Sequence, residues 1–69
     1  MEISARNSLR GTITKLEVGA VNTEVTLEIV PGVEVVAVIT KSSAEKLGLA
    51  LGSSAYAIVK ASDVMVATD

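Results

Sequence analysis

A strict alternation over residues 21–29 constrains the fold more than any other feature of this chain. Apolar or small β-branched side chains at one parity (Val21, Thr23, Val25, Leu27 and Ile29) alternate with polar ones (Asn22, Glu24, Thr26 and Glu28). Because successive side chains of a strand point to opposite faces, this pattern is typical of a half-buried β-strand. Such a strand needs neighbouring strands to complete a sheet with one apolar face.

The turn after this strand predicts a hairpin. Pro31 and Gly32 suit the second and third positions of a type II turn, whose third residue needs a positive φ. Residues 33–40 then form the returning strand, which is apolar on both faces in its second half. A strand of that composition is central in its sheet or lies at an interface.

A further strand is expected before the hairpin, over residues 9–18. The alternation of apolar and polar side chains is interrupted between Ile13 and Leu16, which are three residues apart. This indicates a bulge or sharp coiling near Thr14 and Lys15. A long strand of a small barrel needs such a bend. We therefore expect this strand to curl.

One short helix is predicted, over residues 42–47. Ser42 and Glu45 match a capping box, and Gly48 stands where a C-cap glycine belongs. These signals allow one or two helical turns.

Two more strands complete the expected fold. Residues 55–60 and 64–68 read as strands four and five, after a turn at Gly52 and Ser53. Three strands, a short helix and two strands follow the order of an OB-fold. We therefore expect one all-β domain over residues 1–69, a five-stranded OB-fold-like Greek-key barrel with the helix between strands three and four.

The chain carries more apolar material than so small a core needs. Of its 69 residues, 49% are apolar, and no Cys is present to form a disulfide. A domain of this size buries only about 60% of its unfolded surface and is marginally stable alone. We expect the surplus apolar surface to be buried between the subunits of a homo-oligomer.

Composition also narrows the function classes. The absence of His and Cys effectively excludes zinc, copper and iron–sulfur sites of the usual kinds and leaves few acid–base groups, so we expect no enzyme. A net charge of −2 and a single aromatic residue disfavour nucleic acid, which OB-folds bind by stacking. No apolar run approaches the length of a membrane span and the first residues lack a signal-peptide core, so we expect a cytoplasmic protein.

Three short polar clusters together suit an anion. They are Ser4-Ala5-Arg6-Asn7, Thr40-Lys41-Ser42-Ser43 and Lys60-Ala61-Ser62. Each combines one cation with hydroxyl or amide donors, and none contains a carboxylate. If the fold brings them together, they form a pocket for a small, fully deprotonated oxyanion.

Each cluster also has a simpler interpretation. A lone Arg6 is usually a solvated side chain near a chain end, and a lone Lys60 an edge-strand lysine that discourages aggregation. Ser42 would cap the predicted helix in either case, which leaves Ser43 free for an anion.

A site built only from donors favours an anion that carries no proton. Molybdate, tungstate and sulfate qualify at neutral pH. Hydrogen phosphate would lose a hydrogen bond where its own proton meets another donor. This argument disfavours phosphate and leaves the choice among the other anions to the size of the cavity.

Three motifs, taken in order, resemble one family. The chain begins Met-x-Ile-Ser-Ala-Arg-Asn-x-Leu-x-Gly, continues with Ala-x-Ile-Thr-x-x-Ser and closes with Val-Lys-Ala-Ser-x-Val-Met. Over essentially its whole length it resembles the molbindins, the small Mop or molybdenum-pterin-binding proteins. The resemblance implies an OB-type barrel in a homohexamer, a trimer of dimers. It also implies storage of molybdate or tungstate between subunits in the cytoplasm, without catalysis.

The resemblance also implies which residues contact the oxyanion. They are Ser4, Ala5, Arg6, Thr40, Ser43, Lys60, Ala61 and Ser62. Asn7 is expected to order its loop, and the turn with Gly19 and Val21 is a candidate for a second class of site. No side chain would coordinate the metal directly, and no pterin is expected because only Tyr56 could stack on one. The alternative is an accessory module that passes molybdate to a transporter or regulator.

Overall fold

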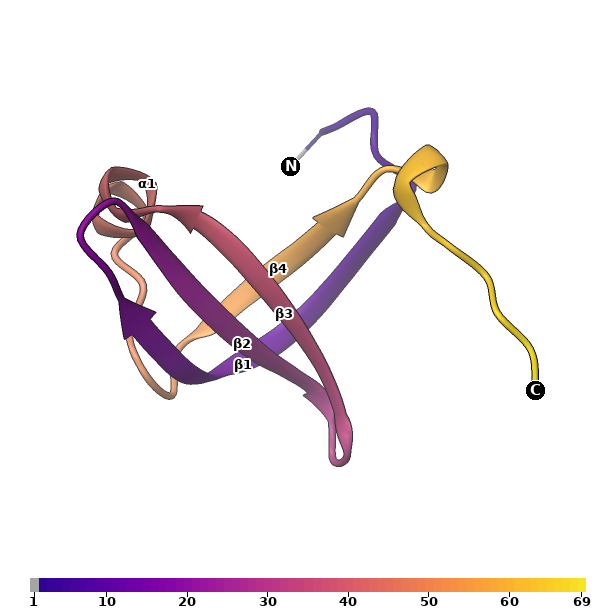
Figure 1. The fold of residues 1–69 in the computed structure, drawn as a ribbon, viewed down its shortest axis with the longest axis horizontal. Coiled ribbons are helices and arrows are strands. Elements are labelled where there is room, and N and C mark those ends of the chain that lie inside the picture. The colour runs from indigo at the N-terminus through magenta and orange to yellow at the C-terminus, as the bar shows by residue number, and fades with distance from the viewer. Residues whose placement is uncertain (1) are drawn as a thin grey trace.

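A computed structural model describes residues 2–69 and contains a curled antiparallel sheet with one short helix (Figure 1). The strands are β1 (Asn7–Val18), β2 (Asn22–Val30), β3 (Val33–Thr40) and β4 (Ser54–Val59). Helix α1 (Lys41–Leu47) lies between β3 and β4, and the 3-10 turn η1 (Ala61–Asp63) follows β4. The strand order is β3-β2-β1-β4, so β3 and β4 are the edges.

Strand β1 is shared between two neighbours. Residues 7–12 pair with β4, and residues 12–18 pair with β2. The register with β2 shifts between Ile13 and Lys15, which confirms the bulge predicted there. An extra residue on one strand of a pair bends that strand and increases its twist. The bulge therefore lets β1 curl from one partner strand to the other.

The core lies inside this curl. Its buried apolar residues are Ile13, Val25, Leu27 and Ala57. The alternation predicted for β2 is confirmed at Thr23, Val25 and Leu27, which all face the core.

Two residues of that alternation depart from the prediction. Val21 is 72% exposed, because β2 begins at Asn22 and Val21 belongs to the preceding turn. Thr26 is buried although it has the parity of the solvent-facing residues. It lies on a strand flanked on both sides, opposite Lys15 of β1 and Val36 of β3, and its neighbours cover it.

The hairpin and the helix follow local chemistry, with one correction. Strand β3 has its predicted bounds, and Gly32 adopts the positive φ of 84° that the predicted turn requires. Helix α1 ends at Gly48 as predicted, but its N-cap is Thr40 and not Ser42. Thr40 has an extended backbone, with φ −69° and ψ 150°, and the helix begins at Lys41, one residue earlier than predicted. Within residues 2–69, no helix is long and apolar enough to cross a membrane.

The predicted fifth strand is wrong for residues 64–68. After β4 the chain enters η1, where the Asp63 N–H donates to the Lys60 carbonyl at 2.9 Å. This turn directs the following residues away from the sheet (Figure 1). Met65 and Val66 are consequently 94% and 89% exposed. The sheet therefore has four strands, and its two edges stay open.

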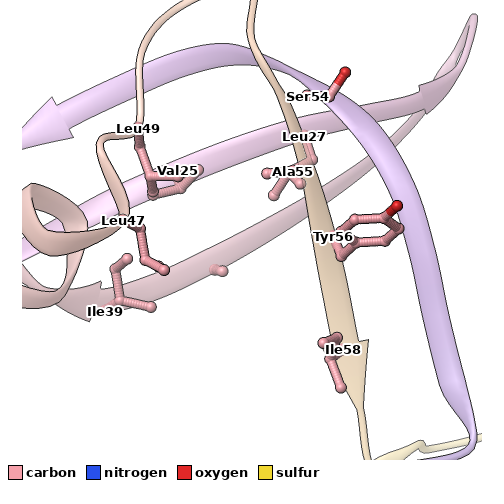
Figure 2. Close-up of a pocket in the computed structure, with 10 residues that line it drawn as sticks. Val25, Leu27, Ile39, Leu47, Leu49, Ser54, Ala55, Tyr56 and Ile58 are labelled. Atoms are coloured by element: carbon pink, nitrogen blue, oxygen red, sulfur yellow. The ribbon is translucent and has the colours of Figure 1, made fainter. Parts of the chain in front are cut away.

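An apolar groove separates these open edges. It has a volume of about 380 Å³ and is lined by Val25, Leu27, Ala37, Ile39, Leu47, Leu49, Ser54, Ala55, Tyr56 and Ile58. Figure 2 shows side chains of β2, β3 and α1 on one side of the groove and those of β4 on the other. The groove occupies the gap that a fifth strand would close.

Gly11 is predicted to be essential for the curl of β1. A Cβ at this position would lie 2.8 Å from the Glu28 carbonyl oxygen and 2.9 Å from Ile29 Cδ1. The isoleucine can rotate, but the carbonyl belongs to the β2 backbone. Gly11→Ala should therefore lower the free energy of unfolding by about 1–3 kcal/mol in urea titrations.

Ser8→Ala is the matched control, because Ser8 is an exposed residue of the same strand. Its effect should stay within about 0.5 kcal/mol. Equal stability of Gly11→Ala and the control would contradict the close approach of β1 and β2.

Candidate functional site

The polar clusters at the two ends of the sequence, residues 4–7 and residues 60–62, lie at the same end of the sheet. Asn7 pairs with Val59 at the end of the β1–β4 ladder, and its side-chain Nδ2 donates to the Val59 carbonyl at 3.2 Å. Arg6 precedes Asn7 and Lys60 follows Val59, so both cations lie just outside the same end of this ladder. The bond made by Asn7 is of the kind expected for a loop-ordering residue. Two cations are thus placed at one end of the sheet.

Backbone and hydroxyl donors surround these cations. Lys60 immediately precedes η1, so the N–H groups of Ala61 and Ser62 begin a helical turn, where such groups lack an acceptor within the turn. Ser4 is exposed in the loop before β1. We call this set (Ser4, Ala5, Arg6, Lys60, Ala61 and Ser62) the arginine end.

The charges of the arginine end are uncompensated. Within residues 2–69 the single ion pair joins Lys15 Nζ to Glu17 Oε1 at 2.9 Å, so neither Arg6 nor Lys60 has a carboxylate partner. Asp63 is close in sequence to Lys60 but forms no ion pair with it. Unpaired cations beside free donors attract an anion.

The second cluster forms a short chain of hydrogen bonds. Thr40 Oγ1 accepts from the Ser43 N–H at 3.1 Å and donates to Ser43 Oγ at 2.8 Å. The Thr40 hydroxyl is therefore occupied, and the Ser43 hydroxyl proton is the one that remains to donate. Thr40 orients Ser43, which is the more direct donor. We call Thr40, Ser42 and Ser43 the hydroxyl end.

The turn expected to hold a second site adjoins the hydroxyl end. The Lys41 N–H donates to the Val21 carbonyl at 2.7 Å, which ties the turn to the start of α1. A shallow cavity of about 540 Å³ lies there, lined by Ala20, Val21, Thr40, Lys41, Ser42 and Glu45. The Gly19 N–H donates to the Asn22 carbonyl at 2.8 Å and is not available to an anion.

The arginine and hydroxyl ends lie at opposite ends of β1. The arginine end adjoins Asn7, where β1 begins, whereas α1 lines one cavity together with Leu16 and Val18 at the far end of β1. At about 3.3 Å per residue, β1 spans roughly 35 Å along its path. Figure 1 likewise shows α1 and η1 at opposite sides of the molecule. One copy of the chain therefore does not bring the three clusters together.

The outer face of the sheet is unsuited to anions. Glu17 stands directly opposite Glu24, and Glu28 directly opposite Glu34. The hydrogen bond and charge of Glu17, with the charges of Glu24 and Glu34, raise the pKa of Lys15 above its usual value. The even spacing of Glu24 and Glu28 along one strand is the signal by which a sequence reading could have found this face. The like charges of these glutamates disfavour an anion on this face.

Direct metal coordination has no site in the described part of the chain. Among residues 2–69, no three His, Cys, Asp or Glu side chains lie close enough to hold a metal ion. The donors at both ends are instead cations, hydroxyls and amides, which suit an intact oxyanion.

Sequence comparison identifies relatives of the chain. Residues 3–66 match the TOBE domain family. The chain is 44% identical to molybdenum-pterin-binding protein 2 of Clostridium pasteurianum, covering 96% of this chain and 97% of that protein. It is 48% identical to the molybdenum transport protein ModE of Azotobacter vinelandii, covering all of this chain but only 26% of ModE. It therefore spans about a quarter of that longer relative.

Solved structures agree with this relationship. A molybdate-binding protein from Sporomusa ovata matches with a TM-score of 0.91 and 35% identity, covering 99% of this chain and all of that one. The cytoplasmic molybdate-binding protein ModG, crystallised with molybdate bound, matches with a TM-score of 0.89 and 48% identity. That match covers 94% of this chain and 46% of ModG.

The N-cap of α1 provides a test of the hydroxyl end. Thr40→Ala removes the oxygen that accepts from the Ser43 N–H and should lower the free energy of unfolding by about 1 kcal/mol. Ser42→Ala removes no cap and should change it by less than about 0.5 kcal/mol. Urea unfolding at one protein concentration measures both. If Ser42→Ala lost more of its free energy of unfolding than Thr40→Ala, Ser42 would be the N-cap instead.

Proposed function

Because the chain belongs to the TOBE domain family, among the molybdenum-pterin-binding (Mop) proteins, we propose that it binds molybdate or tungstate as an intact oxyanion and stores it in the cytoplasm. The family is one of molybdate-binding proteins and not an enzyme class, and the proposal includes no catalytic step. The relatives named for molybdate binding support the ligand, and the donor chemistry of the two ends supports its form.

The position of Arg6 and Lys60 at the same end of the β1–β4 ladder carries this proposal. Two unpaired cations flank the end of a strand pair, next to hydroxyls and to N–H groups at the start of η1. The Arg6 guanidinium can donate two parallel hydrogen bonds to a tetrahedral oxyanion. No carboxylate takes part, so every group at the arginine end can donate at once.

Discrimination against phosphate follows from the same donor set. Molybdate and tungstate carry no proton at neutral pH and accept from every side. Hydrogen phosphate would direct its own O–H at a donor and leave one group unsatisfied, at a cost of about 1–3 kcal/mol. The protein would thereby reject an abundant cellular anion of similar shape.

A complete site requires two copies of the chain. The arginine end and the hydroxyl end lie at opposite ends of β1, so one anion meets both only where the arginine end of one copy faces the hydroxyl end of another. A two-fold pair creates two such contacts at once, because the same surfaces meet twice. We propose a homo-oligomer with intersubunit sites, with the hexamer as its expected form.

The apolar groove between β3 and β4 supports this association. It exposes Leu47, Tyr56 and Ile58 among its lining residues and lies between two free strand edges. Residues 64–66 form an exposed apolar segment that does not pair with its own sheet. We propose that the matching segment of a second copy packs on the groove, which would bury apolar surface and pair a free strand edge.

An accessory role is the second candidate. The chain covers only 26% of the molybdenum transport protein ModE, so the same module also occurs inside longer proteins. In that role the chain would pass molybdate to another protein. Native mass spectrometry of the purified chain with molybdate separates the two roles: a homo-oligomer that retains several oxyanions supports storage, and a chain that binds none without a partner supports the accessory role.

Arg6→Ala should weaken molybdate binding by about 1.5–3 kcal/mol, roughly a 10- to 150-fold rise in Kd, because a charge-assisted bond is lost. Isothermal titration calorimetry measures the change. Arg10→Ala is the matched control, since Arg10 pairs with Tyr56 along β1 and lies outside the arginine end. Unchanged affinity in Arg6→Ala would remove Arg6 from the site.

Mixing two inactive variants tests whether the site is shared. Arg6→Gln with Lys60→Gln disables the arginine end, and Thr40→Asp sets a negative charge at the hydroxyl end while preserving an N-cap. Each variant alone should bind no molybdate. Co-refolded at equal amounts, half of each end is intact, so about one quarter of the wild-type capacity should return. No recovery in a mixed oligomer would contradict a shared site.

A further inference from the structure

A cavity lies beneath α1, at the end of the sheet where β1 ends and β2 begins. Its volume of about 350 Å³ is within the range of small-molecule sites. Much of its wall is apolar, and Leu16, Ala44 and Leu49 contribute half-buried side chains to it. No residue of the arginine end or of the hydroxyl end lines it, so a site here is separate from the proposed oxyanion site.

The inner end of this cavity holds a hydroxyl without a partner. Thr23 lies opposite Val18 and has the same parity as Val25 and Leu27, so its side chain points into the curl of the sheet. The residue is 1% exposed, and its Oγ1 makes no hydrogen bond within residues 2–69. A buried hydroxyl in this state is rare and destabilises the fold. A bound molecule that reached Oγ1 would remove this cost.

Water alone is a poor partner for this hydroxyl. A buried water needs about two to four polar contacts. The other polar side chains of the wall belong to Lys41 and Glu45, and both residues are exposed. Thr23 is therefore the one polar side chain at the inner end. A molecule with one hydrogen-bonding oxygen and an apolar body matches a wall of that composition.

We propose that this cavity binds a small uncharged molecule that has an apolar body and one hydroxyl or carbonyl oxygen. The oxygen forms a hydrogen bond with Thr23 Oγ1, and the body packs on Leu16, Ala44 and Leu49. Because Oγ1 is enclosed, the molecule enters when α1 moves outward. Helix α1 buries none of its residues, so this movement exposes little apolar surface.

Cyclohexanol is a suitable probe, because it carries one hydroxyl on an apolar ring. Titrated into ¹⁵N-labelled protein, it should give saturable shifts of the Thr23, Ala44 and Gly48 amide signals in ¹H–¹⁵N correlation spectra. Glycerol has a hydroxyl on every carbon and no apolar body, so it should leave these signals unchanged at the same concentrations. An equal response to glycerol would overturn the proposal. Cyclohexanol shifts confined to β4 would overturn it too, because they would place the probe in the apolar groove.

Two variants and a control test the site itself. Thr23→Val keeps the shape of the side chain and removes the hydroxyl, so the Kd of cyclohexanol should rise roughly 2- to 12-fold. Ala44→Leu fills the cavity from α1 with a good helix former and should abolish binding. Thr26→Val should bind like the wild type, because Thr26 is also a buried threonine of β2 but has the opposite parity and does not line the cavity. An unchanged Kd in Thr23→Val or in Ala44→Leu would contradict the site.

Urea unfolding without the probe tests the state of the hydroxyl. The midpoint of Thr23→Val should lie above that of the wild type, because an apolar group replaces an unpartnered polar one. A lower midpoint would show that the hydroxyl already has a partner, such as an ordered water, and would overturn the proposal. None of these measurements involves molybdate, so their failure would leave the proposed function intact.

Discussion

The curl of β1 is the constraint on which the rest of this structure depends. One strand pairs with β4 through its first half and with β2 through its second. The bulge between Ile13 and Lys15 and the close passage of Gly11 over β2 make that change of partner possible. Without the bend, the core of Ile13, Val25, Leu27 and Ala57 would have no concave face to fill.

The same curl determines where function can lie. It sends the two ends of β1 to opposite sides of the molecule, with Arg6 and Lys60 at one and Thr40 and Ser43 at the other. The acidic pairs on the outer face of the sheet lie between those ends and would repel an anion there. This separation is the reason why the proposed oxyanion site combines two copies of the chain.

Much of this architecture could be predicted from local sequence. The alternation of residues 21–29, the Pro31-Gly32 turn and the phase slip near Thr14 each predicted an element that the structure contains. Features of this kind depend on residues that are close together in the sequence. The failures were Ser42 as a cap and residues 64–68 as a strand. In both cases a helical turn begins earlier in the chain than the pattern indicated. In addition, residues 64–68 have no edge of their own sheet beside them with which to pair.

By itself, the sequence determined four of the five predicted strands, the short helix and the donor types of the three polar clusters, because periodicity and turn residues act over a few residues. It also identified the three polar clusters as donors without carboxylates. Only the tertiary structure decided which clusters meet. The pairing of Asn7 with Val59, which spans most of the chain, brings Arg6 and Lys60 to one end of the sheet. Thr40, the N-cap of α1, lies with that helix on the other side of the molecule. Contacts of that range depend on the path of the whole sheet, which no local pattern encodes.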